Sequence, residues 1–246
     1  MSVPREWLVP GWNAPPHVRA FVTTRAGGVS KGEYAAMNLG YSSGDDTSHV
    51  TRNRAIVRQE LPSEPRWMKQ VHGTHAAHID RSDDVPTADA AVTSHAGRVA
   101  VVLTADCMPL FFSDDAGTRV AVAHAGWRGM AAGVIESTVQ AMETDPARVM
   151  AWMGPAIGPD AFEVGPEVRD AFIAVDPAAS DAFRARTPGK FMADLYALAR
   201  RRLARAGVKS VHGGGFCTYH EPERFFSYRR VKASGRMGAF IWIEPR

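Results

Sequence analysis

The sequence lacks three features that mark specialised classes of protein: many cysteines, a long apolar run and a dense stretch of positive charge. Its two cysteines, Cys107 and Cys217, lie far apart, so no disulfide framework is implied and a reducing cytoplasm is expected. The longest apolar run, Val99–Phe112, is interrupted by Asp106 and is too short to span a bilayer. The N-terminal segment MSVPREWLVPGWNAPP contains no apolar core of signal-peptide length. We therefore expect a cytoplasmic protein with no membrane partner.

The charge balance also argues against a nucleic-acid partner. The formal net charge is only +3, and the arginines are scattered apart from residues 200–202 and 229–230. Proteins that bind nucleic acid usually carry a denser basic stripe on one face. A small anionic substrate or inorganic phosphate fits this mild basicity equally well.

The composition is that of one globular domain. Of the 246 residues, 45% are hydrophobic and 22% are charged, which is enough for an ample core and is not typical of disorder. No linker or repeat divides the chain, so we expect a single domain over residues 1–246. Apolar and β-branched segments predict strands at Arg19–Thr24, Trp67–His72, Ala88–Val92, Val99–Thr104, Val120–His124, Val149–Met153 and Ala239–Ile243.

Helices are expected between these strands. The apolar periodicity and the start and stop signals predict helices at His49–Leu61, Gly129–Glu143, Pro166–Val175 and Phe191–Ala206. Strands and helices alternate irregularly along the chain. This pattern favours the α+β class, with mixed β-sheets flanked by helices.

The stretch VVLTADCMPLFF, residues 101–112, is otherwise typical of a buried strand, yet it contains Asp106, Cys107 and Pro109. Charged groups are rarely buried without a partner. His124 ends a neighbouring predicted strand, so Cys107 and His124 would come close if the two strands pair. A further histidine, His72, lies in the segment QVHGTHAAH, where Gly73 and the β-rich context favour the end of a strand and a turn.

Three interpretations of these cysteine and histidine residues are open. His72, Cys107 and His124 could hold a metal, because imidazole and thiolate are good zinc ligands and three protein ligands plus water define a catalytic site. Their separations of 35 and 17 residues match no compact zinc-finger spacing. Alternatively, Cys107 could be a nucleophile activated by His124. Finally, Cys107 could be a buried core thiol.

Several arginines are candidates for binding an anion. Arg128 lies in the loop AGWRG ahead of a predicted helix, where backbone N–H groups favour negative charge. Arg25 lies beside Gly27 and Gly28, and Arg229 lies in the segment FFSYRR. The planar guanidinium group suits phosphate.

Taken together, the motifs resemble the bacterial laccase-domain family. TTRAGGVS, MNLG, KQVHG, DAAVT, LTADCMPL, AVAHAGWRG, MGPAIG with FEVG, and CTYHEPERFFSYRR with GRMGAFIW occur in the family's order, from about Phe21 to Ile243. Met108 and Leu110 replace other apolar residues, which is a minor departure. Members are often labelled polyphenol oxidases and are now regarded as purine nucleoside phosphorylases with adenosine deaminase activity.

The resemblance implies a metal site, substrates and two reactions. It implies that His72, Cys107 and His124 hold zinc, with copper as the alternative metal. It also implies phosphorolysis of adenosine, inosine, guanosine and methylthioadenosine, and deamination of adenosine at C6. Catalytic roles are expected for the three ligands and for Asp106, which would either act as an acid or base or cap backbone N–H groups. Pro109 is expected to end the strand.

Arg25, Asn38, Arg128 and Arg229 are the expected contacts to the substrate or phosphate. Two alternative functions remain. One is a cysteine hydrolase or amidase acting on a cell-wall precursor, with Cys107 as the nucleophile. The other is a copper-dependent phenol oxidase, although no two histidines are separated by one residue as in the H-x-H pairs of multicopper oxidases. A non-enzymatic role in binding a partner is less favoured, because it gives no reason for the cysteine and histidine cluster.

Overall fold

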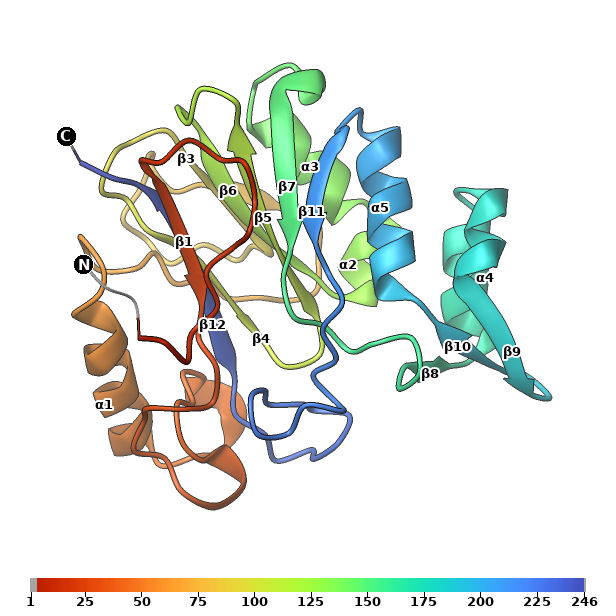
Figure 1. The fold of residues 1–246 in the computed structure, drawn as a ribbon, viewed down its shortest axis with the longest axis horizontal. Helices are drawn as coiled ribbons and strands as arrows, with labels where there is room; N and C mark the ends of the chain where they lie inside the picture. The colour runs from red at the N-terminus through yellow and green to blue at the C-terminus, as the bar shows by residue number, and fades with distance from the viewer. Residues whose placement is uncertain (1–3, 246) are drawn as a thin grey trace.

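Two β-sheets lie face to face at the centre of the fold (Figure 1). The computed structural model describes residues 4–245. A three-stranded antiparallel sheet has the order β1-β12-β4, made of Val18–Val22, Met237–Ile243 and Ala100–Thr104. The larger sheet has the order β11-β7-β5-β6-β3-β2, made of Ser210–Gly213, Val149–Met153, Met108–Asp114, Val120–Ala125, Ala90–Thr93 and Ala76–His78. Its end pairs, β11–β7 and β2–β3, are parallel, and the central pairs are antiparallel.

Helices cover the outer face of each sheet. Helix α1 (Thr47–Arg58) packs on the three-stranded sheet, while α2 (Trp127–Ala132), α3 (Val134–Ala141) and α5 (Leu195–Arg205) pack on the six-stranded sheet. Because both faces of the larger sheet are covered, β5, β6 and β7 are buried along their whole length. This burial explains why their sequences are continuous apolar runs rather than alternating ones.

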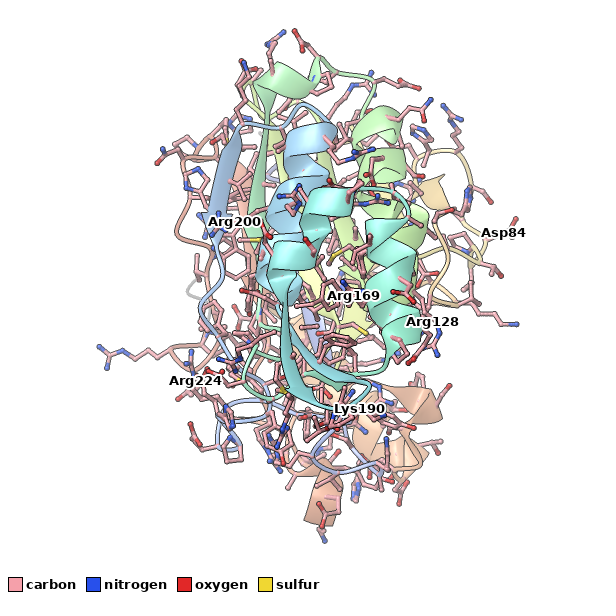
Figure 2. The ribbon with its side chains drawn as sticks, turned by 90° about the vertical axis from the view of Figure 1, so that its right-hand side faces the viewer. Asp84, Arg128, Arg169, Lys190, Arg200 and Arg224 are labelled. Carbon is pink, nitrogen blue, oxygen red and sulfur yellow. The ribbon has the colours of Figure 1, made fainter. Side chains whose placement is uncertain are left out.

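The space between the sheets is filled by large side chains. Phe111 stacks on Trp152 with ring centroids 5.7 Å apart, and residues of β1, β4 and β12 complete this layer. An outer element consists of α4 (Pro166–Ile173) and the small sheet β8-β10-β9, made of Glu163–Val164, Lys190–Ala193 and Phe183–Thr187. Figure 2 shows α4 and this sheet in front of α5, with Lys190 at the end of the β9–β10 hairpin. Within residues 4–245, no helix is long and apolar enough to cross a membrane.

The predicted α+β class, with mixed sheets flanked by helices, is confirmed. Three predicted elements differ most from the structure, and the other predicted strands and helices shift by at most three residues at either end. The segment predicted as the strand Trp67–His72 forms only an isolated bridge at Lys69, and the preceding residue, Arg66, forms another. Gly133, with φ +111°, divides the helix predicted over residues 129–143 into α2 and α3.

The helix predicted from Phe191 begins four residues later. The Asp194 side chain accepts hydrogen bonds from the N–H groups of Tyr196 and Ala197, so it caps α5 at this point. The preceding residues, Lys190–Ala193, form β10.

Residues 101–112 form two strands in two different sheets. Strand β4 ends at Thr104 in the three-stranded sheet, and β5 begins at Met108 in the six-stranded sheet. Asp106 has φ +91° in the crossover between them. The expectation that Pro109 ends the strand is wrong, because Pro109 is the second residue of β5. Its carbonyl accepts from the N–H of Gly154, just beyond β7, while the carbonyl of Gly154 accepts from the Tyr196 hydroxyl in place of the N–H that proline lacks.

Candidate metal centre and active-site cavity

Three side chains from separate parts of the sequence converge where β4 crosses to β5. His72, Cys107 and His124 each offer one ligand atom, and these atoms all lie within 4.8 Å of one another. Cys107 Sγ is 3.8 Å from His72 Nε2, and the two imidazole centroids are 4.7 Å apart. The predicted approach of Cys107 to His124 arises from the pairing of β5 with β6, in which Met108 faces Ala125.

A buried carboxylate, Asp89, positions both histidines. Its Oδ1 accepts from His72 N at 2.9 Å and lies 2.8 Å from His124 Nδ1, while its Oδ2 accepts from Gly73 N at 2.7 Å and from Val71 N at 3.0 Å. Because Nδ1 of His124 is occupied, its Nε2 is free to face a metal. Asp89 was missed by the sequence analysis; its only signal was a carboxylate that opens the DAAVT motif ahead of a buried strand.

The electrostatics of the three donors favour a thiolate. Burial alone raises the pKa of Cys107, but the charge of His124 and hydrogen bonds from His124 and His72 outweigh burial and bring that pKa to about 6. Burial lowers the pKa of His124, but Cys107 and Asp89 outweigh burial and bring it to about 9. Burial raises the pKa of Asp89, but hydrogen bonds from His124, Gly73 and Val71 hold it below its ordinary value.

The donor set fits a metal ion. A thiolate and two imidazoles suit zinc or copper, and three protein donors leave a further coordination position. The glycine of the AGWRG loop makes room for this arrangement, because a Cβ on Gly126 would lie 2.7 Å from Cys107 Sγ. The donor types do not distinguish zinc from copper.

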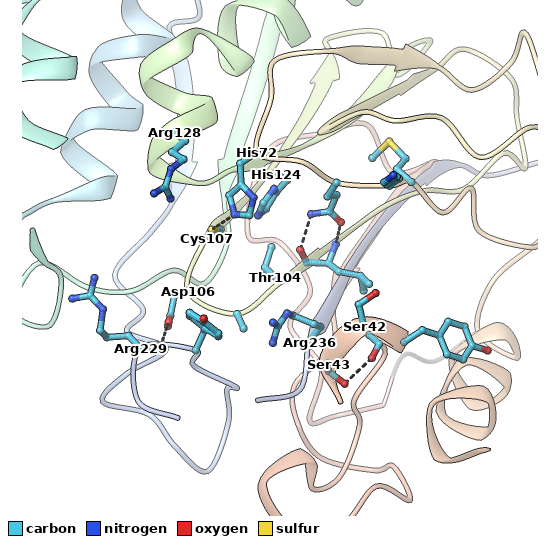
Figure 3. Close-up of a pocket in the computed structure, with 18 of the residues that line it drawn as sticks. Ser42, Ser43, His72, Thr104, Asp106, Cys107, His124, Arg128, Arg229 and Arg236 are labelled. Atoms are coloured by element: carbon cyan, nitrogen blue, oxygen red, sulfur yellow. Dashed lines mark hydrogen bonds between the residues drawn. The ribbon is translucent and has the colours of Figure 1, made fainter. Parts of the chain in front are cut away.

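The three donors lie in the wall of a large basic cavity (Figure 3). The cavity has a volume of about 850 Å³. Its cationic lining residues are Arg54, Lys69, Arg128, Arg229, Lys232 and Arg236, and its carboxylate is Asp106. Aromatic residues, among them Tyr41, Trp127 and Tyr228, also line it. A cavity of this size, lined by six cationic side chains and one carboxylate, suits an anionic ligand or a ligand that binds together with phosphate.

Asp106, in the crossover between β4 and β5, bonds to the segment that contains Thr218 and Arg229. Its Oδ1 accepts from the Thr218 hydroxyl and its Oδ2 accepts from Arg229 N, both at 2.6 Å. Of the two roles expected for Asp106, these contacts favour capping of a backbone N–H.

The four arginine and asparagine residues expected to contact substrate divide into two groups. Arg128 and Arg229 line the cavity, with their guanidinium groups over Trp127 and Phe162. Arg25 is not among the lining residues; it donates to the carbonyls of Ala35 and Pro222.

Asn38 is also absent from the cavity lining and is fully buried. Its Oδ1 accepts from the N–H groups of Gly40 and Arg236, and its Nδ2 donates to Ser43 and Asp45. Asn38 therefore positions parts of the cavity wall from behind.

The chain is similar to known proteins along nearly its whole length. Residues 19–244 match the family model described as multi-copper polyphenol oxidoreductase laccase. The chain is 49% identical to the purine nucleoside phosphorylase PA4543 of Pseudomonas aeruginosa, over 97% of this chain and 98% of that protein. It is 50% identical to the purine nucleoside phosphorylase YfiH of Escherichia coli, over 96% and 98%. The crystal structure of Neisseria meningitidis protein NMB0706 superposes with a TM-score of 0.95 at 48% identity, over 98% of this chain and 100% of that chain. YlmD from Geobacillus stearothermophilus superposes with a TM-score of 0.90 at 32% identity, over 100% and 98%.

Proposed function

This chain belongs to the family described as multi-copper polyphenol oxidoreductase laccase, and from that premise we propose that it is a metal-dependent purine nucleoside phosphorylase. The names of the relatives from Pseudomonas aeruginosa and Escherichia coli support this activity. The observation that carries the proposal is the His72, Cys107 and His124 group in the wall of a cavity rich in unpaired cations. The proposed substrates are adenosine, inosine, guanosine and methylthioadenosine, together with inorganic phosphate.

In the proposed reaction, an oxygen of phosphate bonds to C1′ of the ribose while the bond from C1′ to the purine breaks. The base leaves with the bonding electrons and takes up a proton. Arg128 and Arg229 are suited to hold the phosphate dianion, because they enter the cavity from one side of the donor group. Phe162, Trp127 and Ile157 supply apolar surface nearby for the substrate.

The metal would be held by His72, Cys107 and His124, with Asp89 fixing both histidines. When bound, the metal would act as a Lewis acid in the wall of the cavity that holds the substrate. We propose zinc, with copper as the alternative.

We propose adenosine deamination as a second reaction of the same cavity, in which water replaces the C6 amino group and ammonia leaves. Its support is the three-donor set, because three protein ligands with a further position are the arrangement of hydrolytic zinc sites.

The main competing function is a cysteine hydrolase acting on a cell-wall precursor. It is favoured by the lowered pKa of Cys107 beside His124, which is the arrangement of an activated nucleophile. A copper-dependent phenol oxidase has less support, because the described residues contain a single group of donors of this kind.

Release of hypoxanthine from inosine by the zinc-loaded protein tests the proposal. We expect release that requires phosphate and that is lost in Cys107→Ala. Cys217→Ala is the matched control, since Cys217 is the other free thiol and does not line the cavity. Full activity of the metal-free protein would contradict the metal dependence, and release independent of phosphate would contradict phosphorolysis. Conversion of adenosine to inosine in phosphate-free buffer tests the deaminase activity in the same preparations.

A further inference from the structure

Among residues 4–245, no carboxylate forms an ion pair with a cation of the cavity. Ion pairs are frequent elsewhere in residues 4–245, but none of them includes Arg54, Lys69, Arg128, Arg229, Lys232 or Arg236. Asp106, the carboxylate of the cavity wall, accepts hydrogen bonds from Thr218 and Arg229 N. The positive charge in the cavity therefore remains available to a ligand.

Four of these cations, Arg128, Arg229, Lys232 and Arg236, lie at two ends of the cavity. Figure 3 shows Arg128 and Arg229 on one side of the His72–Cys107–His124 group, and Arg236 on the other side with Ser42 and Ser43. Lys232 belongs to the second end, because Lys232 Nζ and the Arg236 guanidinium both lie over the Tyr228 ring, at 4.3 and 5.8 Å. A single inorganic phosphate accounts for one end only.

The second end is built around Arg236. Its Nη1 donates to the carbonyls of Ser234 and Gly235, at 2.6 and 3.0 Å, and its backbone N–H donates to the buried Asn38. Gly40 is needed for this placement, since a Cβ there would lie 2.7 Å from Arg236 Cγ. Within residues 4–245, Nε and Nη2 of Arg236 have no hydrogen-bond acceptor.

A second polar group beside Arg236 also lacks a partner. The Thr104 hydroxyl is buried without a hydrogen bond, although Thr104 lines the cavity and is only 1% exposed. Thr104 pairs with Met237, the residue after Arg236, across strands β4 and β12. Buried polar groups usually have partners, so the Thr104 hydroxyl leaves an unused hydrogen-bonding group at this end of the cavity.

We propose that Arg236 and Lys232, with Ser42 and Thr104, bind the 5′-phosphate of a purine nucleoside 5′-monophosphate. The inference rests on the proposed phosphorolysis and extends it from nucleosides to nucleotides. Arg236 and Lys232 supply two positive charges for the two negative charges of one phosphate monoester. Inorganic phosphate attacks C1′, the bond to the base breaks, and the base takes up a proton. The products are the purine base and ribose 1,5-bisphosphate.

Calorimetric titration of zinc-loaded protein with inosine and with inosine 5′-monophosphate, without inorganic phosphate, tests the subsite. We expect the nucleotide to bind about tenfold more tightly or better, since charge-assisted hydrogen bonds are among the stronger polar contacts. Arg236→Met should remove this preference, and Lys232→Met should reduce it. Arg128→Met is the matched control at the opposite end, which should weaken binding of inorganic phosphate and keep the preference for the nucleotide.

Two further variants test the subsite independently, in case Arg236→Met does not fold. Gly40→Ala keeps every charge but displaces Arg236, and Ser42→Asp places a negative charge at the same end; both should remove the preference. Equal affinity for nucleoside and nucleotide in the unmodified protein overturns the inference, as does a preference that survives Arg236→Met. Binding is measured without turnover, so failure of the phosphorylase proposal shows separately as no phosphate-dependent cleavage of inosine.

Discussion

At the residue scale, the candidate metal centre depends on one carboxylate that does not itself belong to the donor group. Asp89 bonds to the backbone around His72 and to the ring of His124, so it fixes two donors from distant parts of the chain. The donors themselves were predicted by the family resemblance, because separations of 35 and 17 residues match no local motif. Asp89 could not be predicted in this way, since its partners are backbone N–H groups, which carry no sequence signal, and the ring of His124, which is 35 residues away.

We predict that Asp89→Asn lowers zinc affinity by about 10- to 100-fold, as expected when a group orienting a metal-bound histidine is changed. Asparagine retains one acceptor but loses the charge and at least one of the backbone contacts. Competition with a chromophoric chelator measures the affinity. Asp181→Asn, which removes an exposed carboxylate, is the control. Unchanged affinity in Asp89→Asn would show that the histidines are held by packing alone.

A second carboxylate, Asp45, lies behind the cavity wall and predicts that the stability of the fold decreases in acid. Burial raises the pKa of Asp45, but hydrogen bonds from Ser30, Asn38 and Asp46 N lower it below its ordinary value. A carboxyl whose pKa is lower in the folded state stabilises the fold above its unfolded pKa of about 4, and this contribution is lost as the pH falls below that value. Asp45→Asn should therefore destabilise the protein at pH 6, and the gap to the unmodified protein should narrow below pH 4.

Urea unfolding at several pH values measures this effect. The same series for Asp181→Asn corrects for the general loss of carboxylate charge. A gap that stays constant with pH would mean that Asp45 acts through hydrogen bonding independent of its charge.

At the element scale, the site is created by the crossover from β4 to β5. The sequence predicted the strand Val99–Thr104 but no separate strand for β5, although residues 101–112 are apolar on both sides of Asp106. In the fold, this apolar character comes from two strands that are buried in different sheets. The positions where a strand changes sheets are set by pairing between distant segments, which periodicity along the chain does not reveal. The break at Gly133 and the start of α5 at Asp194 were also missed, although a glycine and a capping residue mark them in the sequence.

Two substitutions in this crossover distinguish the two roles expected for Asp106, acid–base catalysis and capping of a backbone N–H. Asparagine tolerates the positive φ and can still accept from Arg229 N and bond to Thr218, whereas glycine tolerates the φ but removes both contacts. We predict that Asp106→Asn retains inosine phosphorolysis within several-fold, while Asp106→Gly loses it and loosens residues 217–231. Steady-state kinetics and hydrogen exchange of that segment are the readouts. A loss of about 100-fold or more in Asp106→Asn would instead indicate acid–base catalysis.

At the scale of the whole molecule, the stacked sheets bring together segments that lie more than a hundred residues apart. Asp106 contacts Thr218 and Arg229, and Arg236 is held by Asn38, at separations of 112, 123 and 198 residues. The class of fold followed from the alternation of strands and helices, and it was predicted. The positive charge at the two ends of the cavity was not predicted, because it depends on which arginines form no ion pair within residues 4–245. Arg25 and Arg128 are similar in sequence context, yet only Arg128 lines the cavity.

The sugar product formed from inosine and phosphate by the zinc-loaded protein tests the central claim most directly. Mass spectrometry distinguishes ribose 1-phosphate from free ribose. Phosphorolysis predicts ribose 1-phosphate in an amount equal to the hypoxanthine released, and no product from Cys107→Ala. Free ribose would show hydrolysis instead. No cleavage by folded, zinc-loaded protein would contradict the phosphorylase for inosine and favour the cysteine hydrolase.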